Sequence, residues 1–104
     1  MNRVEALKGF LEQDPQDSFS RYALALEYVK AGQTEDARRE FEFVRDHDPA
    51  YVATYFQLAQ LYRNLGLKHD AEKTYRTGIT AAAKAGDSHT QSELEEALEG
   101  LLGE

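Results

Sequence analysis

The chain has 104 residues, of which 41% are hydrophobic and 30% charged, and it contains no cysteine. These values are typical of one globular domain with a modest core, and the missing cysteine excludes disulfides, thiolate nucleophiles and cysteine-ligated zinc. The formal net charge is -7 at pH 7. Because nucleic acids and anionic membrane surfaces repel such a chain on average, we expect no nucleic acid and no membrane among its partners.

No targeting or membrane-spanning segment is predicted. The first residues, MNRVEALKGFLEQ, carry Glu5 inside their apolar stretch and so lack the apolar region of a signal peptide. No segment approaches the run of about 20 apolar residues that crosses a bilayer. We therefore expect a soluble, cytoplasmic chain, which could also be a piece of a longer protein.

Helical periodicity dominates the N-terminal part of the sequence. A first helix is predicted to begin after Asn2, which has Glu5 at the capping-box spacing, and to end at Asp14-Pro15 because proline disfavours a helical conformation before it. A second helix is predicted over residues 18–31. It is expected to end there because the next residue, Gly32, suits the left-handed conformation past a helix end.

The next two helices follow the same plan. Thr34 is the predicted N-cap of a third helix that runs to about Asp46, and Asp48-Pro49 then repeats the earlier break. A fourth helix is predicted over residues 50–65, ended by Gly66.

The C-terminal part departs from that plan. The fifth helix is predicted to run from about Lys68 to Ala85, since alanines stand where the Asp-Pro break would fall. After Gly86, Ser88 and Gln91 have the spacing of a capping box for a sixth helix. With no strand pattern, the predicted fold class is all-α with about six helices.

An offset of 34 residues relates two stretches of the chain. It preserves apolar, small and turn residues together, which is the mark of a repeat array. The matching pairs are Asp14-Pro15 with Asp48-Pro49, Leu24-Ala25 with Leu58-Ala59, Tyr28 with Tyr62, Gly32 with Gly66, Asp36-Ala37 with Asp70-Ala71, and Phe41 with Tyr75.

This pattern resembles the tetratricopeptide repeat, whose motif is W-x2-L-G-x2-Y, then A-x3-F, then P in 34 residues. The first copy reads Arg21-x2-Leu24-Ala25-x2-Tyr28, Ala37-x3-Phe41, Pro49, and the second reads Tyr55-x2-Leu58-Ala59-x2-Tyr62, Ala71-x3-Tyr75, Ala83. Arg21 stands where the family prefers tryptophan, Gly78 where it prefers alanine, and Ala83 replaces the closing proline.

The resemblance implies an α-α superhelix of helical hairpins in a single domain over residues 1–104. We expect an N-terminal flanking helix over residues 1–17, two repeats over 18–51 and 52–85, and a capping helix over 86–104. The family's role is to bind proteins or peptides in a groove lined by the first helices of its repeats. The chain is therefore expected to be an interaction module or scaffold.

A second apolar stripe on the second predicted helix supplies candidate groove residues. It runs at spacings of three and four residues, turned away from the motif face. By resemblance, this stripe and the matching places of the fourth helix would line the groove, apolar at one end and polar to basic at the other. The candidates are Phe19, Tyr22, Leu26, Val29, Lys30, Phe56, Gln60, Arg63 and Asn64. Alternatively, the first helix or a neighbouring chain covers the stripe.

No chemistry beyond binding is predicted. The three histidines, His47, His69 and His89, lack a metal-ligand spacing, and the chain has no phosphate-binding glycine loop and no nucleophile elbow. We expect no enzymatic activity, no cofactor and no metal. The leading function is docking of a protein or peptide partner of unknown identity, and the alternative is self-assembly into a homo-oligomer.

Overall fold

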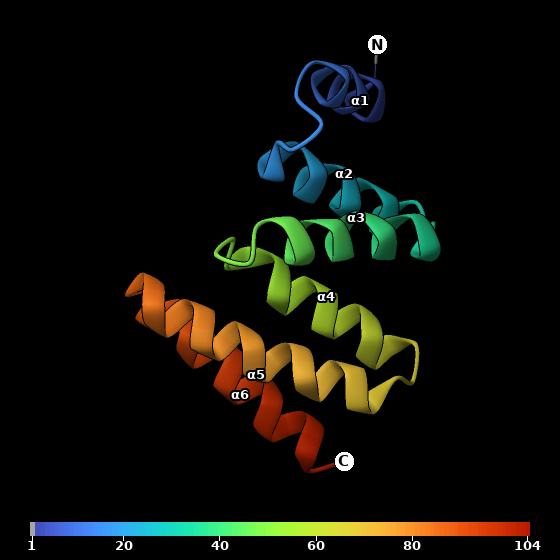
Figure 1. The fold of residues 1–104 in the computed structure, drawn as a ribbon. Helices are drawn as coiled ribbons and strands as arrows, with labels where there is room; N and C mark the ends of the chain where they lie inside the picture. The colour runs from blue at the N-terminus through green and yellow to red at the C-terminus, as the bar shows by residue number, and fades with distance from the viewer. Residues whose placement is uncertain (1) are drawn as a thin grey trace. The chain divides into compact units, whose positions relative to one another are not determined.

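Six α-helices and no strand make up residues 2–104, which the computed structural model describes (Figure 1). The all-α class with six helices is thus confirmed. The chain divides into two compact units, Met1–Asp48 with the first three helices and Pro49–Glu104 with the last three. The helices are α1 (Arg3–Gln13), α2 (Ser18–Lys30), α3 (Thr34–His47), α4 (Ala53–Asn64), α5 (Lys68–Ala85) and α6 (Ser88–Leu102).

Turn residues set several helix ends as predicted. The Asn2 side chain accepts a hydrogen bond of 2.8 Å from the backbone N–H of Glu5 and so caps α1. Gly32, Gly66 and Gly86 follow α2, α4 and α5 with φ of 74°, 78° and 70°. This left-handed conformation carries no steric penalty for glycine, which is why the helices stop there.

Two predicted caps are wrong by one residue. Thr34 is already helical, because the N–H of Ala37 bonds to the carbonyl of Gln33 and makes Gln33 the N-cap. Likewise α6 is capped by Asp87 and not by Ser88. The carboxylate of Asp87 accepts a hydrogen bond of 3.0 Å from the backbone N–H of Thr90. A negative charge is favourable at this end of a helix because the unpaired backbone N–H groups make it positive.

The start of α4 also differs from the prediction. Residues 50–52 lie outside the regular helix, and the N–H of Thr54 bonds to the carbonyl of Tyr51. The hydroxyl of Tyr55 donates a 2.5 Å hydrogen bond to the carbonyl of Pro49. This bond ties the connecting segment to the first turn of α4, and the regular helix begins at Ala53.

The core of the first unit lies between its helices. Between α1 and α2, Leu7 and Leu11 meet Ala23 and Leu24. Val4 and Tyr28 pack at the edge of this cluster. Ala37, Phe41 and Val44 of α3 are fully or almost fully buried. The motif positions therefore hold the helices together, as a repeat array requires.

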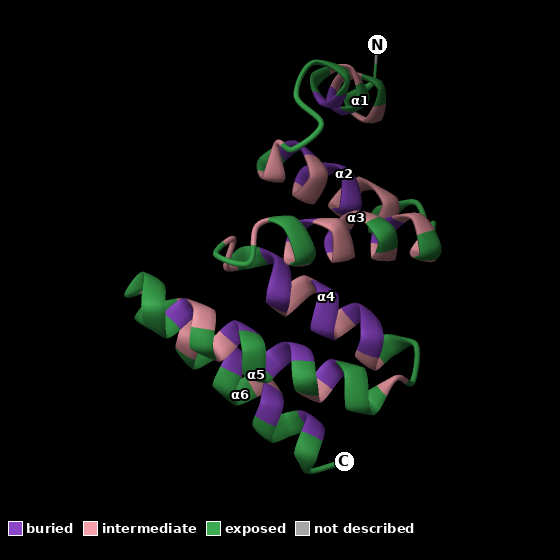
Figure 2. Cartoon of the chain, in the orientation of Figure 1, coloured by how far each residue is buried: buried purple, intermediate pink, exposed green. Residues whose placement is uncertain are grey.

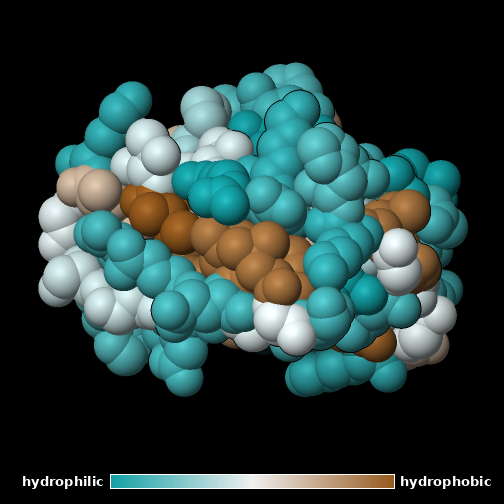
Figure 3. All heavy atoms as spheres, turned by 90° about the horizontal axis from the view of Figure 1, so that it is seen from below, coloured by the Kyte–Doolittle hydropathy of each residue, from teal (hydrophilic) through white to brown (hydrophobic). Residues whose placement is uncertain are grey.

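In the second unit, buried residues follow the facing sides of α4, α5 and α6 (Figure 2). Leu94, Leu98 and Leu101 are the buried residues of α6. Helix α6 packs against α5 and, to a smaller extent, against α4. Seen from the α5–α6 side, an elongated hydrophobic band remains, bordered by hydrophilic residues (Figure 3). Leu102, at the end of α6, is 48% exposed.

Gly78 in α5 has a packing reason. A Cβ atom at this position would lie 2.5 Å from the Cβ of Tyr55 and 3.1 Å from a methyl carbon of Leu94. Atoms of real side chains do not approach so closely, so α4 and α5 can meet here only through a glycine. The departure from the family's alanine thus makes room for the buried Tyr55, which is 1% exposed.

The position that matches Tyr55 in the first unit holds Arg21, which packs differently. Arg21 takes the place of Tyr55, and its guanidinium carbon lies 4.0 Å from the centre of the Phe43 ring. The guanidinium also bonds to Glu40 at 2.9 Å and to the carbonyl of Pro15 at 3.0 and 3.1 Å. A planar cation can stack on an aromatic ring, so it replaces the expected tryptophan without entering the core.

Candidate partner-binding site

The α2 patch is defined here by five predicted residues, all in the first unit. Phe19 is 62% exposed and Val29 is 44% exposed, while Tyr22 and Leu26 are half-buried. The fifth member, Lys30, has an exposed side chain 3.8 Å from Glu27. Two large apolar side chains therefore face solvent on one helix, with a cation at its C-terminal end.

The neighbouring helices leave this patch partly open. Helix α1 packs on the other side of α2, against Ala23, Leu24 and Tyr28. Helix α3 contributes Phe41, whose ring meets Tyr22 edge-on with centroids 6.0 Å apart. Coverage by the first helix, one of the predicted alternatives, is thus not what the structure shows for Phe19 or Val29.

The α4 patch is defined by Phe56, Gln60, Arg63 and Asn64, all in the second unit. Phe56 and Gln60 both contact Tyr75 of α5. The two aromatic rings meet edge-on with centroids 6.3 Å apart, and the hydroxyl of Tyr75 donates a 2.9 Å hydrogen bond to Oε1 of Gln60. Asn64 is exposed at the end of the helix.

Arg63 is held by the C-terminal end of the same unit. Its Nε donates a 2.8 Å hydrogen bond to Oε1 of Glu104, and its Nη2 contacts the same oxygen. The guanidinium also lies over Gly100 of α6, where a Cβ would make ordinary van der Waals contact with its nitrogens at 3.8 and 3.9 Å. Hydrogen bonds with Glu104 and then Tyr75 raise the pKa of Arg63. Arg63 is thus paired with a carboxylate of its own unit.

Two residues of this network, Tyr75 and Glu104, were not predicted as site residues. A signal for the first lies in the 34-residue offset. We call α2 with α3 the first hairpin and α4 with α5 the second hairpin. The first hairpin holds Leu26 and Phe41 at the positions where the second holds Gln60 and Tyr75, so a polar pair replaces an apolar pair. Glu104 gave no such signal, because its partner lies 41 positions away on another helix.

The acidic and histidine residues do not form a metal site within residues 2–104, where no cluster of three or more candidate ligands occurs. The ring of His47 stacks on Phe43 with centroids 3.9 Å apart, and its Nδ1 lies 2.9 Å from the carbonyl of that residue. This histidine is thus engaged with its own helix. Nor is any helix among the described residues long and apolar enough to cross a membrane.

Comparisons with known proteins agree with the motif. A sequence profile described as tetratricopeptide repeat matches residues 28–89, which is more than half of the chain. No match was found among the curated proteins. A solved tetratricopeptide repeat domain protein from Salinibacter ruber is 41% identical, with a TM-score of 0.83 over 86% of this chain and 91% of that chain.

More distant structures share the fold. The TPR2B domain of yeast Sti1 in its pHsp70 complex gives a TM-score of 0.88 at 17% identity, over 96% of this chain and 80% of that chain. PcrH in complex with the chaperone binding region of PopD gives 0.88 at 17% identity, over 96% and 76%. With the 34-residue motif and the profile match, these findings show that the chain belongs to the tetratricopeptide repeat family.

Proposed function

We propose that the chain is a protein-interaction module, not an enzyme, and that it binds a peptide or protein partner through the α2 patch and the α4 patch. The observation that carries this proposal is the exposure of Phe19 and Val29. They stay open to solvent although both other helices of their unit pack on α2. Exposed apolar side chains gathered on one face are typical of interaction sites.

The relatives support the class of partner. Two proteins of similar fold, the Sti1 domain and PcrH, are known from complexes with pHsp70 and with a segment of PopD. At 17% identity they indicate no particular ligand for this chain. They do fit a protein or peptide as the class of molecule bound.

The two patches suit different parts of a partner. The α2 patch offers apolar contact, and the α4 patch offers the guanidinium of Arg63. Glu104 now holds that guanidinium in the way that an acidic side chain of a partner would. We propose that the bound partner carries apolar residues and an acidic residue, and that the carboxylate of this acidic residue displaces Glu104 from Arg63.

The test begins with displayed random peptides selected against the wild-type chain. The affinity of a selected peptide is then measured for variants that circular dichroism shows to be folded. We expect Phe56→Ala and Arg63→Ala to weaken binding roughly thirtyfold, since aromatic and arginine hot spots commonly contribute about 2 kcal/mol or more. Lys30→Ala should act less strongly and lose its effect in high salt, as a screened rim charge does.

Two further variants sharpen this test. Glu104→Gln should strengthen binding of an acidic peptide, because it removes the competing carboxylate, whereas Arg63→Ala weakens binding. Arg76→Ala is the matched control, since Arg76 pairs with Glu72 within α5 and belongs to neither patch. Equal affinities for wild type, Arg63→Ala and Glu104→Gln would contradict the role of the α4 patch.

Self-assembly predicts different behaviour for the α2 patch. If this patch joined two copies, wild type would sediment as a dimer and Leu26→Asp as a monomer. A monomeric wild type, together with a folded Leu26→Asp protein that binds the selected peptide at full strength, would remove the α2 patch from the binding site.

A further inference from the structure

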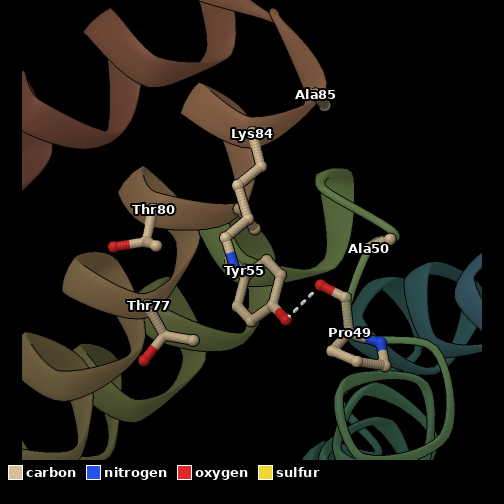
Figure 4. Close-up of a pocket in the computed structure, with 8 residues that line it drawn as sticks. Pro49, Ala50, Tyr55, Thr77, Thr80, Lys84 and Ala85 are labelled. Carbon is tan, nitrogen blue, oxygen red and sulfur yellow. Dashed lines mark hydrogen bonds between the residues drawn. The ribbon is translucent and has the colours of Figure 1, made fainter.

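A pocket of about 550 Å3 lies in the second unit, and none of its lining residues belongs to the α2 patch or the α4 patch (Figure 4). It is bounded on one side by Pro49 and Ala50 ahead of α4, and on the other by the last turns of α5. The ring of Tyr55 forms part of its wall. This volume falls within the range of small-molecule sites.

The pocket follows from the unequal lengths of two neighbouring helices. Helix α5 has 18 residues, whereas α4 has 12. Because the Asp-Pro break is absent from α5, its last turns continue past the start of α4. Those turns carry Ala81 and Ala85, whose small side chains leave the space beside Tyr55 unfilled.

The pocket wall is apolar apart from one charge. The hydroxyls of Thr77 and Thr80 bond to helix carbonyls at 3.0 and 3.4 Å, and Figure 4 shows both oxygens pointing away from Tyr55. The side chain of Lys84 runs down toward the Tyr55 ring in the same view. Within residues 2–104, Lys84 has no ion-pair partner.

The pocket is lined by a positive charge, whereas the whole molecule is negatively charged. The chain holds 19 acidic residues against 12 lysines and arginines, yet no carboxylate lines this pocket and one free ammonium does. A second pocket, in the first unit, shows the opposite pattern, since Glu5 and Asp17 line it without a cation. An anionic ligand therefore fits the pocket beside Lys84 and not the other.

From these features we infer that the pocket beside Tyr55 binds an apolar carboxylate, with its hydrocarbon body against the alanines, Pro49 and Tyr55 and its carboxylate on Lys84. Burial of apolar surface supplies most of the affinity, and the ion pair selects acids over neutral analogues. This site is independent of the proposed peptide-binding patches. The same chemistry occurs in a free carboxylic acid and at the end of a peptide.

The experiment titrates the 15N-labelled chain with 3-phenylpropionate and with its neutral isostere 3-phenylpropanamide, followed by NMR shifts. We expect saturable shifts clustered around Tyr55, Ala81 and Lys84, with the acid bound up to about fivefold more tightly than the amide. High salt should reduce this ratio toward one. A second arm uses N-acetyl-glycyl-phenylalanine and its amide, so that the preferred source of the carboxylate is measured.

Three variants control the test. Lys84→Gln should abolish the preference for the acid while retaining weak binding of the amide. Lys73→Gln, which removes an exposed lysine of the same helix outside the pocket, should leave the preference unchanged. Ala81→Leu should fill the space and weaken both ligands.

The outcomes are separable from those of the peptide-binding test, which uses other residues. Acid preference that Lys84→Gln removes and Lys73→Gln leaves intact supports the site, whichever source binds more tightly. The proposal is overturned if no ligand shifts these residues, if acid and amide bind equally to wild type, or if both lysine variants act alike.

Discussion

The hydroxyl of Tyr75 donates a 2.9 Å hydrogen bond to Oε1 of Gln60, and the matching positions of the first hairpin hold Phe41 and Leu26. The second hairpin has thus exchanged an apolar pair for a hydrogen-bonded pair at the same two positions. The edge-on aromatic contact beside it is kept, between Tyr22 and Phe41 in one hairpin and between Phe56 and Tyr75 in the other.

The paired exchange predicts a non-additive effect on stability. Tyr75→Phe should lower the free energy of unfolding by about 0.5–1.5 kcal/mol, because the Gln60 amide loses its partner. Adding Gln60→Leu should recover most of that loss, since the double variant restores the apolar pair of the first hairpin. Urea denaturation of the two single variants and the double variant measures the coupling. Strictly additive losses would show that the two side chains act independently.

Gly78 and Gly9 should respond in opposite directions to the same substitution. Gly78→Ala places a methyl group 2.5 Å from the Cβ of Tyr55, which cannot rotate away, so we expect a net loss of about 1–2 kcal/mol despite the better helix propensity. A Cβ at Gly9 meets nothing within 4 Å. Gly9→Ala should therefore stabilise α1 by about 0.5–1 kcal/mol. Thermal melts of both variants measure these effects. A melting temperature of Gly78→Ala equal to or above that of wild type would contradict the close packing at Gly78.

Thr54 offers a stabilising change. It is fully buried, and its hydroxyl has no hydrogen-bond partner among residues 2–104. Thr54→Val keeps the branched shape and removes the desolvated hydroxyl, so the free energy of unfolding should rise by about 1–3 kcal/mol. Thr74→Val is the control, because the Thr74 hydroxyl bonds to the carbonyl of Asp70 at 2.8 Å. A gain from the control as large as that from Thr54→Val would mean that the missing partner is not the cause.

Acidification should weaken the cap of α6. Hydrogen bonds from Thr90 hold the pKa of Asp87 below its ordinary value of 3.8. A carboxyl whose pKa is lowered by folding stabilises the folded state above its unfolded pKa, and this contribution is lost as the pH falls through the folded value. The melting temperature of wild type should therefore exceed that of Asp87→Ala most near neutral pH, and the gap should shrink below about pH 4. A gap that is constant down to about pH 2.5 would exclude this titration.

The elements of the fold were predictable because local residues determine them. Glycines and Asp-Pro pairs mark most helix ends in the sequence, and the structure gives Gly32, Gly66 and Gly86 positive φ angles. The sequence therefore predicts that each helix exists. The predicted N-cap of α6 is wrong because Asp87 and Ser88 are both good capping residues. Only the hydrogen bond from the N–H of Thr90 to the carboxylate of Asp87 distinguishes them. The repeat boundaries at residues 18–51 and 52–85 stay a prediction.

The candidate site was predictable only as helix faces. Periodicity places Phe56, Gln60 and Arg63 on α4, but it does not give the side chains that meet them from α5 and α6. Those partners depend on how helices distant in sequence pack, as the contact between Arg63 and Glu104 shows. That the two patches bind a partner likewise stays a prediction.

The fit between Tyr55 and Gly78 determines what recombination of this chain can exchange. A tyrosine at this place in the first helix of a hairpin needs a glycine in the second, whereas the other hairpin combines Arg21 with Val44. Moving α4 alone into the position of α2 would set a buried tyrosine against a valine, but moving α4 together with α5 would carry both members. The helical hairpin, and not the single helix, is therefore the unit in which such an array can be lengthened or shuffled.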